Sequence, residues 1–191
     1  MLEKVSDRIA ALLVSQGIIP EEDSDIYSYG LALIISFLFN TVVMLIVGAL
    51  VHRFIETLLF LAVFVLLRSF TGGYHADTFL KCMLITFSTY ALVIALSSIE
   101  VITPIYLSCL AIGFVIVLFT APVEHPNKEI SERKKVHHKI TSSVMYIVFS
   151  VIGILVNNCN TRFKSVIFFA LLADIVLLFI KESTKGEMRN D

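Results

Sequence analysis

Long apolar runs alternate with short polar connections along almost the whole chain. A helix needs roughly 20 predominantly apolar residues to cross a bilayer core of about 30 Å. Six runs approach this length, with predicted bounds of Gly30–Val51, Phe54–Leu67, Phe79–Ser98, Thr103–Ala121, Thr141–Val156 and Ser165–Ile180. The second run is short, so we expect Arg53 and Arg68 to reach toward the interfaces from its ends. The pattern predicts an all-α integral membrane protein with about six transmembrane helices.

The segment before the first run has the period of an amphipathic helix. Charged residues occupy its other faces, and Gly17 is a natural end for it. The apolar positions at helical spacing are Leu2, Val5, Ile9, Leu12 and Leu13. We predict an interfacial helix over residues 1–17, and two interpretations of it remain open. It packs on the bundle as an anchor, or it helps to receive a membrane-bound substrate. With no internal repeat, residues 1–191 are expected to form a single membrane domain.

Composition and charge agree with a bilayer setting. The 191 residues are 57% hydrophobic and 16% charged, whereas soluble domains are about 45–50% apolar and about 25% charged. If the N-terminus is cytoplasmic, twelve of the 15 Lys and Arg residues lie on the cytoplasmic side, leaving Arg53, Arg162 and Lys164 outside. The positive-inside rule therefore predicts a multi-pass protein with both termini in the cytoplasm. The net charge of −1 gives no indication of a nucleic-acid partner.

One predicted cytoplasmic connection, residues 68–82 with the sequence RSFTGGYHADTFLKC, concentrates reactive side chains. Cys82 follows His75 by seven residues, and Arg68 and Lys81 lie nearby. A thiol becomes a nucleophile when a base or a positive environment stabilises its thiolate. An unbroken helix would separate residues seven apart by roughly 10.5 Å along its axis, too far for a hydrogen bond. A catalytic pair of His75 and Cys82 therefore requires a break in the helix.

The sequence offers such a break. Gly72 and Gly73 permit backbone angles closed to other residues, and Asp77 or Thr78 could cap a helix that starts after His75. His75 could then fold back toward Cys82, near a helix N-terminus that favours the thiolate.

Neither a disulfide nor a metal site is the favoured interpretation of the remaining Cys and His residues. Cys82, Cys109 and Cys159 fall in different predicted compartments, so no pair of them is expected to bond. No HExxH or CxxC motif occurs, so we expect no metal and no cofactor. The weaker alternative of a metal site would use His52, His75, His125, His137, His138 and Cys82.

The polar loop over residues 121–140 has two interpretations. It is a solvated loop beside anionic lipid headgroups, or its basic residues attract an acidic peptide. The basic residues in question are Arg133, Lys134, Lys135 and Lys139. Two acids lie within predicted spans, where a charge is costly. For Asp174, pairing with a Lys or a hydroxyl is the simpler account, and Glu56 is interpreted in the same way.

These loops resemble those of the accessory gene regulator B (AgrB) proteins of Gram-positive quorum sensing. In the first loop the likeness rests on Arg68, on Gly72-Gly73-Tyr74-His75-Ala76 and on Cys82. In the second it rests on Pro122-Val123-Glu124, Asn127-Lys128 and Glu132-Arg133-Lys134. Chain length, the six-span layout and the amphipathic N-terminus are also similar.

The resemblance implies a membrane cysteine endopeptidase that removes the C-terminal tail of an AgrD-like propeptide and promotes its cyclisation, usually to a thiolactone. It implies that His75 and Cys82 are the catalytic pair and that the protein is a homodimer in the cell membrane. Arg68, Gly72 and Gly73 are candidates for supporting the loop and the oxyanion. Candidate substrate-binding residues are Glu124, Asn127, Lys128, Arg133, Lys134 and Lys135.

Several alternatives stay open from the sequence. A small transporter or channel would place Asp174 and Glu56 on a polar pathway and would not need Cys82. A non-catalytic membrane adaptor would only present the propeptide to another protease. A third residue that orients His75 is not evident. Asp77, Glu124 and Asn127 are candidates, and a simple dyad is equally compatible with the sequence.

Overall fold

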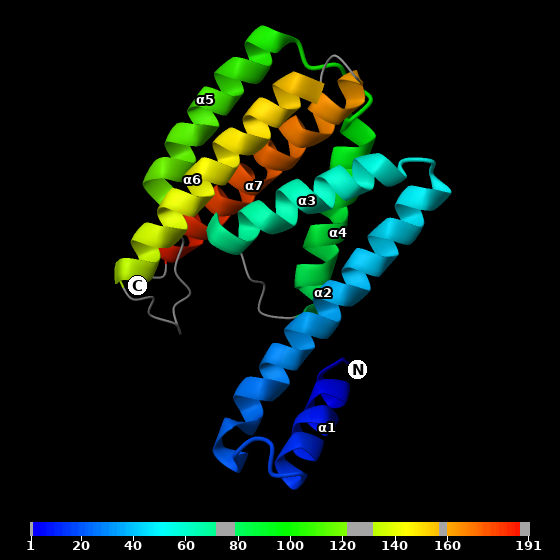
Figure 1. Ribbon diagram of the computed structural model, residues 1–191, viewed down its shortest axis with the longest axis vertical. Coiled ribbons are helices and arrows are strands. Elements are labelled where there is room, and N and C mark those ends of the chain that lie inside the picture. The colour runs from blue at the N-terminus through cyan, green and yellow to red at the C-terminus, as the bar shows by residue number, and fades with distance from the viewer. Residues whose placement is uncertain (1, 72–78, 122–131, 157–159, 188–191) are drawn as a thin grey trace. The chain divides into compact units, whose positions relative to one another are not determined.

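The computed structural model describes residues 2–71, 79–121, 132–156 and 160–187. Within these ranges all regular structure is helical (Figure 1). A single turn of 3-10 helix, Glu21–Asp23, precedes the second long helix. The α-helices are α1 (Leu2–Ser15), α2 (Ser24–Leu50), α3 (Phe54–Thr71), α4 (Phe79–Leu96), α5 (Thr103–Thr120), α6 (Glu132–Leu155) and α7 (Thr161–Glu187).

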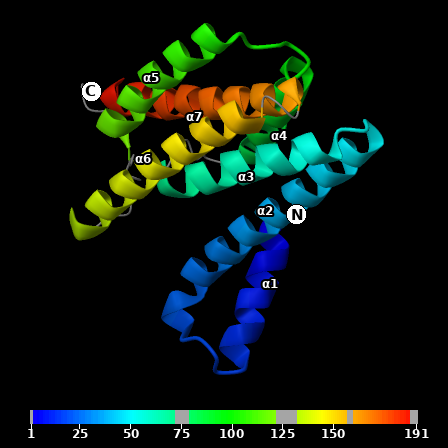
Figure 2. The same cartoon turned by 45° about the horizontal axis from the view of Figure 1, so that its top comes forward.

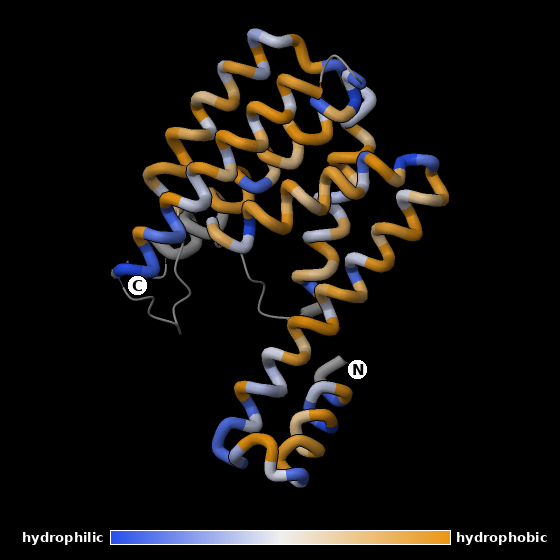
Figure 3. The backbone as a smooth tube through the Cα atoms, viewed as in Figure 1, coloured by the Kyte–Doolittle hydropathy of each residue, from blue (hydrophilic) through white to orange (hydrophobic). Residues whose placement is uncertain are grey.

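Four of the described helices are long and apolar enough to cross a membrane, namely α2, α3, α5 and α6. The apolar part of α4, Leu80–Leu96, is shorter, and α7 carries Arg162, Lys164 and Asp174 within its length. Hydrophobic residues predominate along the middle of the four long helices, and hydrophilic residues gather at turns and at the start of α6 (Figure 3). The all-helical, membrane-type prediction is supported, while the number of six spans stays a prediction.

Several helices are longer than the apolar runs that predicted them. α6 begins at Glu132 rather than at Thr141, and α3 continues through Arg68 to Thr71. The predicted bounds are those of the apolar runs, because lipid covers only the apolar part of a membrane helix. Lys and Arg are good helix formers, however, so a helix continues into polar sequence when no Pro interrupts it.

The chain divides into two compact units. The first contains Met1–Val47 and Ala76–Ser88, and the second contains Gly48–His75 and Thr89–Asp191. The expectation of one membrane domain over residues 1–191 stays a prediction.

In the first unit, α1 ends as its sequence predicts. Gly17 adopts a φ of 68°, a left-handed conformation that favours glycine. The Ile18 N–H donates to the Leu13 carbonyl at 3.0 Å, and the Gly17 N–H donates to the Val14 carbonyl at 2.9 Å. This pair of bonds is a Schellman motif, which satisfies carbonyls that a helix end would leave unpaired.

α1 is tied to α2 through polar side chains. The Ser28 hydroxyl donates to the Asp7 carboxylate, and it lies 3.4 Å from the Ser6 hydroxyl. Ser6 is buried, whereas the apolar residues Val5, Ile9 and Leu12 are exposed. The amphipathic helix therefore packs on α2 and also presents an apolar stripe outward. This arrangement is compatible with both the anchor and the interfacial interpretation.

In the second unit, α6 contacts α3, α5 and α7, and α7 also contacts α3 and α5 (Figures 1 and 2). Aromatic rings fill the unit's interior, with Phe60 stacked on Phe64 at 5.0 Å and tilted against Tyr90 at 5.4 Å. Gly153 of α6 lies against Tyr106 of α5, whose hydroxyl donates to the Ser150 carbonyl at 3.0 Å. Small residues at such crossings let membrane helices approach closely.

Large apolar side chains remain exposed along the outside of several helices. Phe119 of α5, for example, is 78% exposed. Other examples are Leu38, Val42 and Ile46 of α2, Ile112 of α5 and Val151 of α6. Soluble monomers seldom leave apolar surface of this extent in water, whereas lipid solvates it without cost. The exposed surface therefore agrees with the composition in indicating a bilayer.

Candidate functional site

The predicted nucleophile lies at the beginning of a helix. Cys82 is the fourth residue of α4, which begins at Phe79, and its side chain is partly exposed. A thiol here lies within the first turn, where backbone N–H groups have no intrahelical partner and the helix dipole is positive. Its predicted partner His75, together with Gly72 and Gly73, lies outside the described residues. The pairing of His75 with Cys82 therefore stays a prediction.

Two side chains, one from α4 itself and one from α2, lie against backbone carbonyls in the first turns of α4. The Thr86 hydroxyl donates to the Cys82 carbonyl at 2.9 Å. The side-chain amide of Asn40, in the middle of α2, lies 3.4 Å from the Met83 carbonyl. Sequence reasoning overlooked Asn40. Its position in the sequence indicates a structural role, since an Asn within an otherwise apolar span needs a hydrogen-bond partner.

Arg68, the first residue of the predicted catalytic connection, lies in the last turn of α3. Its Nη1 atom is 3.9 Å from the Asp174 carboxylate of α7, and its guanidinium lies 5.5 Å from the centre of the Phe64 ring. Asp174 therefore pairs with Arg68 rather than with the Lys or hydroxyl expected from the sequence, while the interfacial position of Arg68 stays a prediction. A buried carboxylate attracts the nearest long cation, and Arg68 can reach Asp174 because α3 packs against α7.

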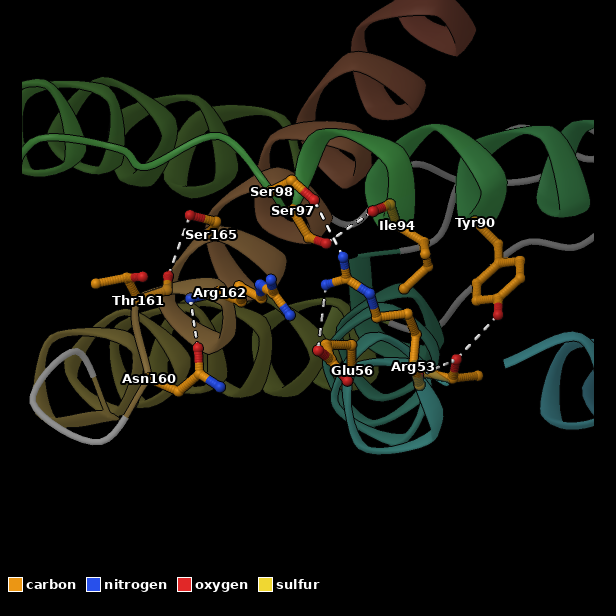
Figure 4. Close-up of polar contacts among 11 residues, drawn as sticks. Arg53, Glu56, Tyr90, Ile94, Ser97, Ser98, Asn160, Thr161, Arg162 and Ser165 are labelled. Atoms are coloured by element: carbon orange, nitrogen blue, oxygen red, sulfur yellow. Dashed lines mark hydrogen bonds and ion pairs between the residues drawn. The ribbon is translucent and has the colours of Figure 1, made fainter. Parts of the chain in front are cut away.

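The far end of the same unit holds a second polar cluster (Figure 4). Arg53 pairs with Glu56 at 3.4 Å and donates to the Ser98 hydroxyl at 3.2 Å. The Thr57 and Tyr90 hydroxyls share a hydrogen bond of 2.9 Å. Glu56 therefore pairs with Arg53, the residue directly before α3, rather than with a Lys or a hydroxyl as the sequence interpretation expected.

The basic residues of the second loop lie largely on a helix. In the first turns of α6, Arg133 and Lys134 are exposed and Lys135 is half-buried. Glu124, Asn127 and Lys128 lie outside the described residues. The ring of His138 lies 5.7 Å from that of Phe70, so the start of α6 is close to the end of α3. No group of three metal-ligating side chains occurs in the part of the chain that the structure describes.

Comparison with known proteins gives the family. The model of the family described as accessory gene regulator B matches residues 6–180. The chain belongs to the accessory gene regulator B family. This result confirms the resemblance seen in the two loops, and the match includes every candidate site residue. The family relates the chain to quorum sensing. It does not by itself assign a chemical role to any residue.

Curated relatives of AgrB type agree with this assignment. AgrB-like protein 2 of Clostridium perfringens is 29% identical over 164 residues, which cover 81% of this chain and 77% of the relative. An AgrB-like protein of Lactiplantibacillus plantarum is 25% identical over 163 residues, covering 83% of this chain and 80% of the relative. No solved structure gives a significant match.

Proposed function

We propose that this AgrB protein is a membrane cysteine endopeptidase that removes the C-terminal tail of an AgrD-like propeptide and cyclises the remainder. One observation carries the proposal: in a chain of this family, a partly exposed thiol lies in the first turn of α4, seven residues after His75. Of the two cysteines that the structure describes, only Cys82 lies at a helix start with a histidine nearby in the sequence.

The proposed first step is acyl transfer to sulfur. His75 takes the Cys82 proton, and the thiolate attacks the scissile carbonyl to give a tetrahedral intermediate. N–H groups of the Gly72-Gly73 segment or of the α4 start would donate to its oxyanion. The protonated His75 then gives its proton to the departing amine. The tail leaves with a new N-terminus, and the rest of the propeptide remains on Cys82 as a thioester.

The proposed second step forms the ring. The neutral His75 takes the proton of a side-chain thiol of the bound propeptide, and the resulting thiolate attacks the thioester. Cys82 leaves as a thiolate and regains a proton from His75. The exchange replaces one thioester by another, so the two sides are nearly balanced in energy. Tethering the thiol beside the acyl carbon gives it a high effective concentration relative to water. Because forming a thioester from an amide is uphill, we expect loss of the released tail to draw the reaction forward.

The setting of the reaction is also part of the proposal. The positive-inside rule places Arg68, Cys82 and the start of α6 at the cytoplasmic side of the cell membrane, with both termini inside. Arg133, Lys134 and Lys135, with Glu124, Asn127 and Lys128, would bind the propeptide, and the working unit would be a homodimer.

Replacing Cys82 tests this function directly, and Cys109 provides the matched control because it is a partly exposed thiol in the middle of α5. Both variants, Cys82→Ala and Cys109→Ala, are reconstituted in liposomes with the propeptide, and tail release is followed by mass spectrometry. We expect Cys82→Ala to release no tail and Cys109→Ala to retain the wild-type rate.

Two results would decide against the proposal. Tail release by Cys82→Ala at the wild-type rate would exclude the Cys82 thiol as the nucleophile. It would favour either a different nucleophile or the alternative of a transporter. A purified wild-type protein that cleaves nothing in liposomes, yet is required for cleavage in cells, would identify an adaptor instead.

A further inference from the structure

Asp174 is a buried acid that the proposed mechanism does not use. Its side chain is 3% exposed, and neither carboxylate oxygen has a hydrogen-bond partner in the described part of the chain. The basic group within ion-pair distance is the Arg68 guanidinium, at 3.9 Å. Burying an acid without hydrogen bonds destabilises the folded protein, so its presence indicates a functional role.

The Arg68 side chain lies close to an aromatic ring of its own helix and to an acid of α7. The ring of Phe64, one turn earlier in α3, lies 5.5 Å from the guanidinium carbon, within the range of a cation–π interaction. Asp174 approaches from α7, and the Arg68 side chain is only 20% exposed. Replacing Asp174 by a neutral residue would remove this ion pair, and with it the charged attachment of the guanidinium to α7.

Arg68 also lies close in the sequence to the predicted catalytic residues. Three residues later α3 ends at Thr71, whose side chain is buried and donates to the Leu67 carbonyl at 3.2 Å. In the sequence, Gly72, Gly73 and His75 follow at once. The end of α3 that leads into this segment is therefore fixed against α7, and Asp174 is the charged part of that attachment.

We propose that Asp174 is a positioning residue for the reaction, acting through Arg68 rather than on the substrate. The inference rests on the proposed function of Cys82 and His75. Asp174 holds the Arg68 guanidinium at the end of α3, the helix that precedes the predicted catalytic residues in the sequence. A displacement of about 1 Å in a reacting group lowers turnover by as much as roughly a hundredfold.

Glu56 provides a matched control. It is also a buried acid in a helix of the same unit, and it also pairs with an arginine, Arg53. That pair lies at the opposite end of α3 from the catalytic connection. Glu56→Gln and Asp174→Asn each replace a buried, arginine-paired carboxyl by an amide, but only Asp174→Asn is expected to affect turnover.

The test is a double-mutant cycle in liposomes, with propeptide cleavage and thermal unfolding measured for each variant. We expect Asp174→Asn to lower kcat by roughly 10- to 100-fold, with little change in KM and with an unfolding temperature close to that of Glu56→Gln. Asp174→Glu should recover most of the activity. In an Arg68→Gln background, adding Asp174→Asn should lower kcat no further, because the two residues act as a unit.

Three outcomes would overturn the inference: wild-type kcat in Asp174→Asn, an equal loss of kcat in Glu56→Gln, or multiplied losses in the double variant. The first would give Asp174 no role in turnover. The second would show a general effect of buried charge. The third would show that Asp174 acts independently of Arg68. If Cys82→Ala still cleaves, the proposed function itself fails; if only the Asp174 results disagree, the function stands without this inference.

Discussion

Gly153 shows how a single residue sets the spacing of two helices. A methyl group added there would overlap the Tyr106 hydroxyl and would come within 3.3 Å of the Ile167 side chain. Tyr106 is fully buried and its hydroxyl is bonded to the Ser150 carbonyl. The ring therefore has little room to give way, and α5 and α6 would have to separate.

Gly153→Ala is accordingly expected to destabilise the protein by about 1–3 kcal/mol, the usual cost of overpacking a well-filled interior. Gly30→Ala in α2 is the control, because no atom lies within 4 Å of the added methyl group. That change should be neutral or stabilising by up to about 1 kcal/mol through helix propensity. Thermal unfolding in detergent micelles measures both, and equal stability of the two variants would contradict the packing described for Gly153.

Asp174 and Asn40 mark how far single residues can be interpreted from the sequence. Both are polar residues in apolar helices, and the cost of placing them there identifies them as residues that need partners. The sequence did not identify the partners, because Arg68 lies on a helix distant in the chain and the Met83 carbonyl is a backbone group. Partner choice depends on how helices pack, which apolar periodicity does not encode.

At the scale of the helix, the amphipathic period located α1, and the six apolar runs located the other described α-helices but misplaced several of their ends. Gly17 predicted its helix end correctly because a left-handed φ is a local requirement. The start of α6 was missed because the loop was interpreted as a polar connection, whereas Glu132 and the basic residues after it are helical. Charged residues mark where the lipid-covered part of a helix ends, but they do not end the helix itself.

The helical start of α6 makes its basic residues a fixed surface, so their contribution to propeptide binding is testable. Reversing the two exposed charges, Arg133→Glu with Lys134→Glu, should raise KM on the order of tenfold while kcat changes little, because exposed charges steer and hold a ligand without entering the chemistry. Cleavage kinetics in vesicles of neutral lipid measure this without competition from anionic headgroups.

Salt provides the control for that experiment. Screening at high ionic strength should raise the wild-type KM toward that of the variant and should leave the variant nearly unchanged. A KM that is unaffected by both the charge reversal and salt would show that these residues serve topology or lipid contact only.

For the whole molecule, the sequence predicted a helical membrane protein of the AgrB family, and both the described helices and the family match support this. The catalytic pairing stays a prediction, since His75 lies outside the described residues. Chemical trapping of the acyl-enzyme does not depend on that geometry. It asks only whether the propeptide becomes bonded to one particular sulfur.

The most direct test is therefore the intact mass of the protein after incubation with a propeptide whose ring-forming residue is replaced by Ala. Without an internal nucleophile, the acyl group should remain on the enzyme. We predict an adduct with the mass of the acyl part of the propeptide without its tail, located on Cys82 and released by hydroxylamine. Tail release without any adduct on Cys82, or an adduct that persists in Cys82→Ala, would contradict the account.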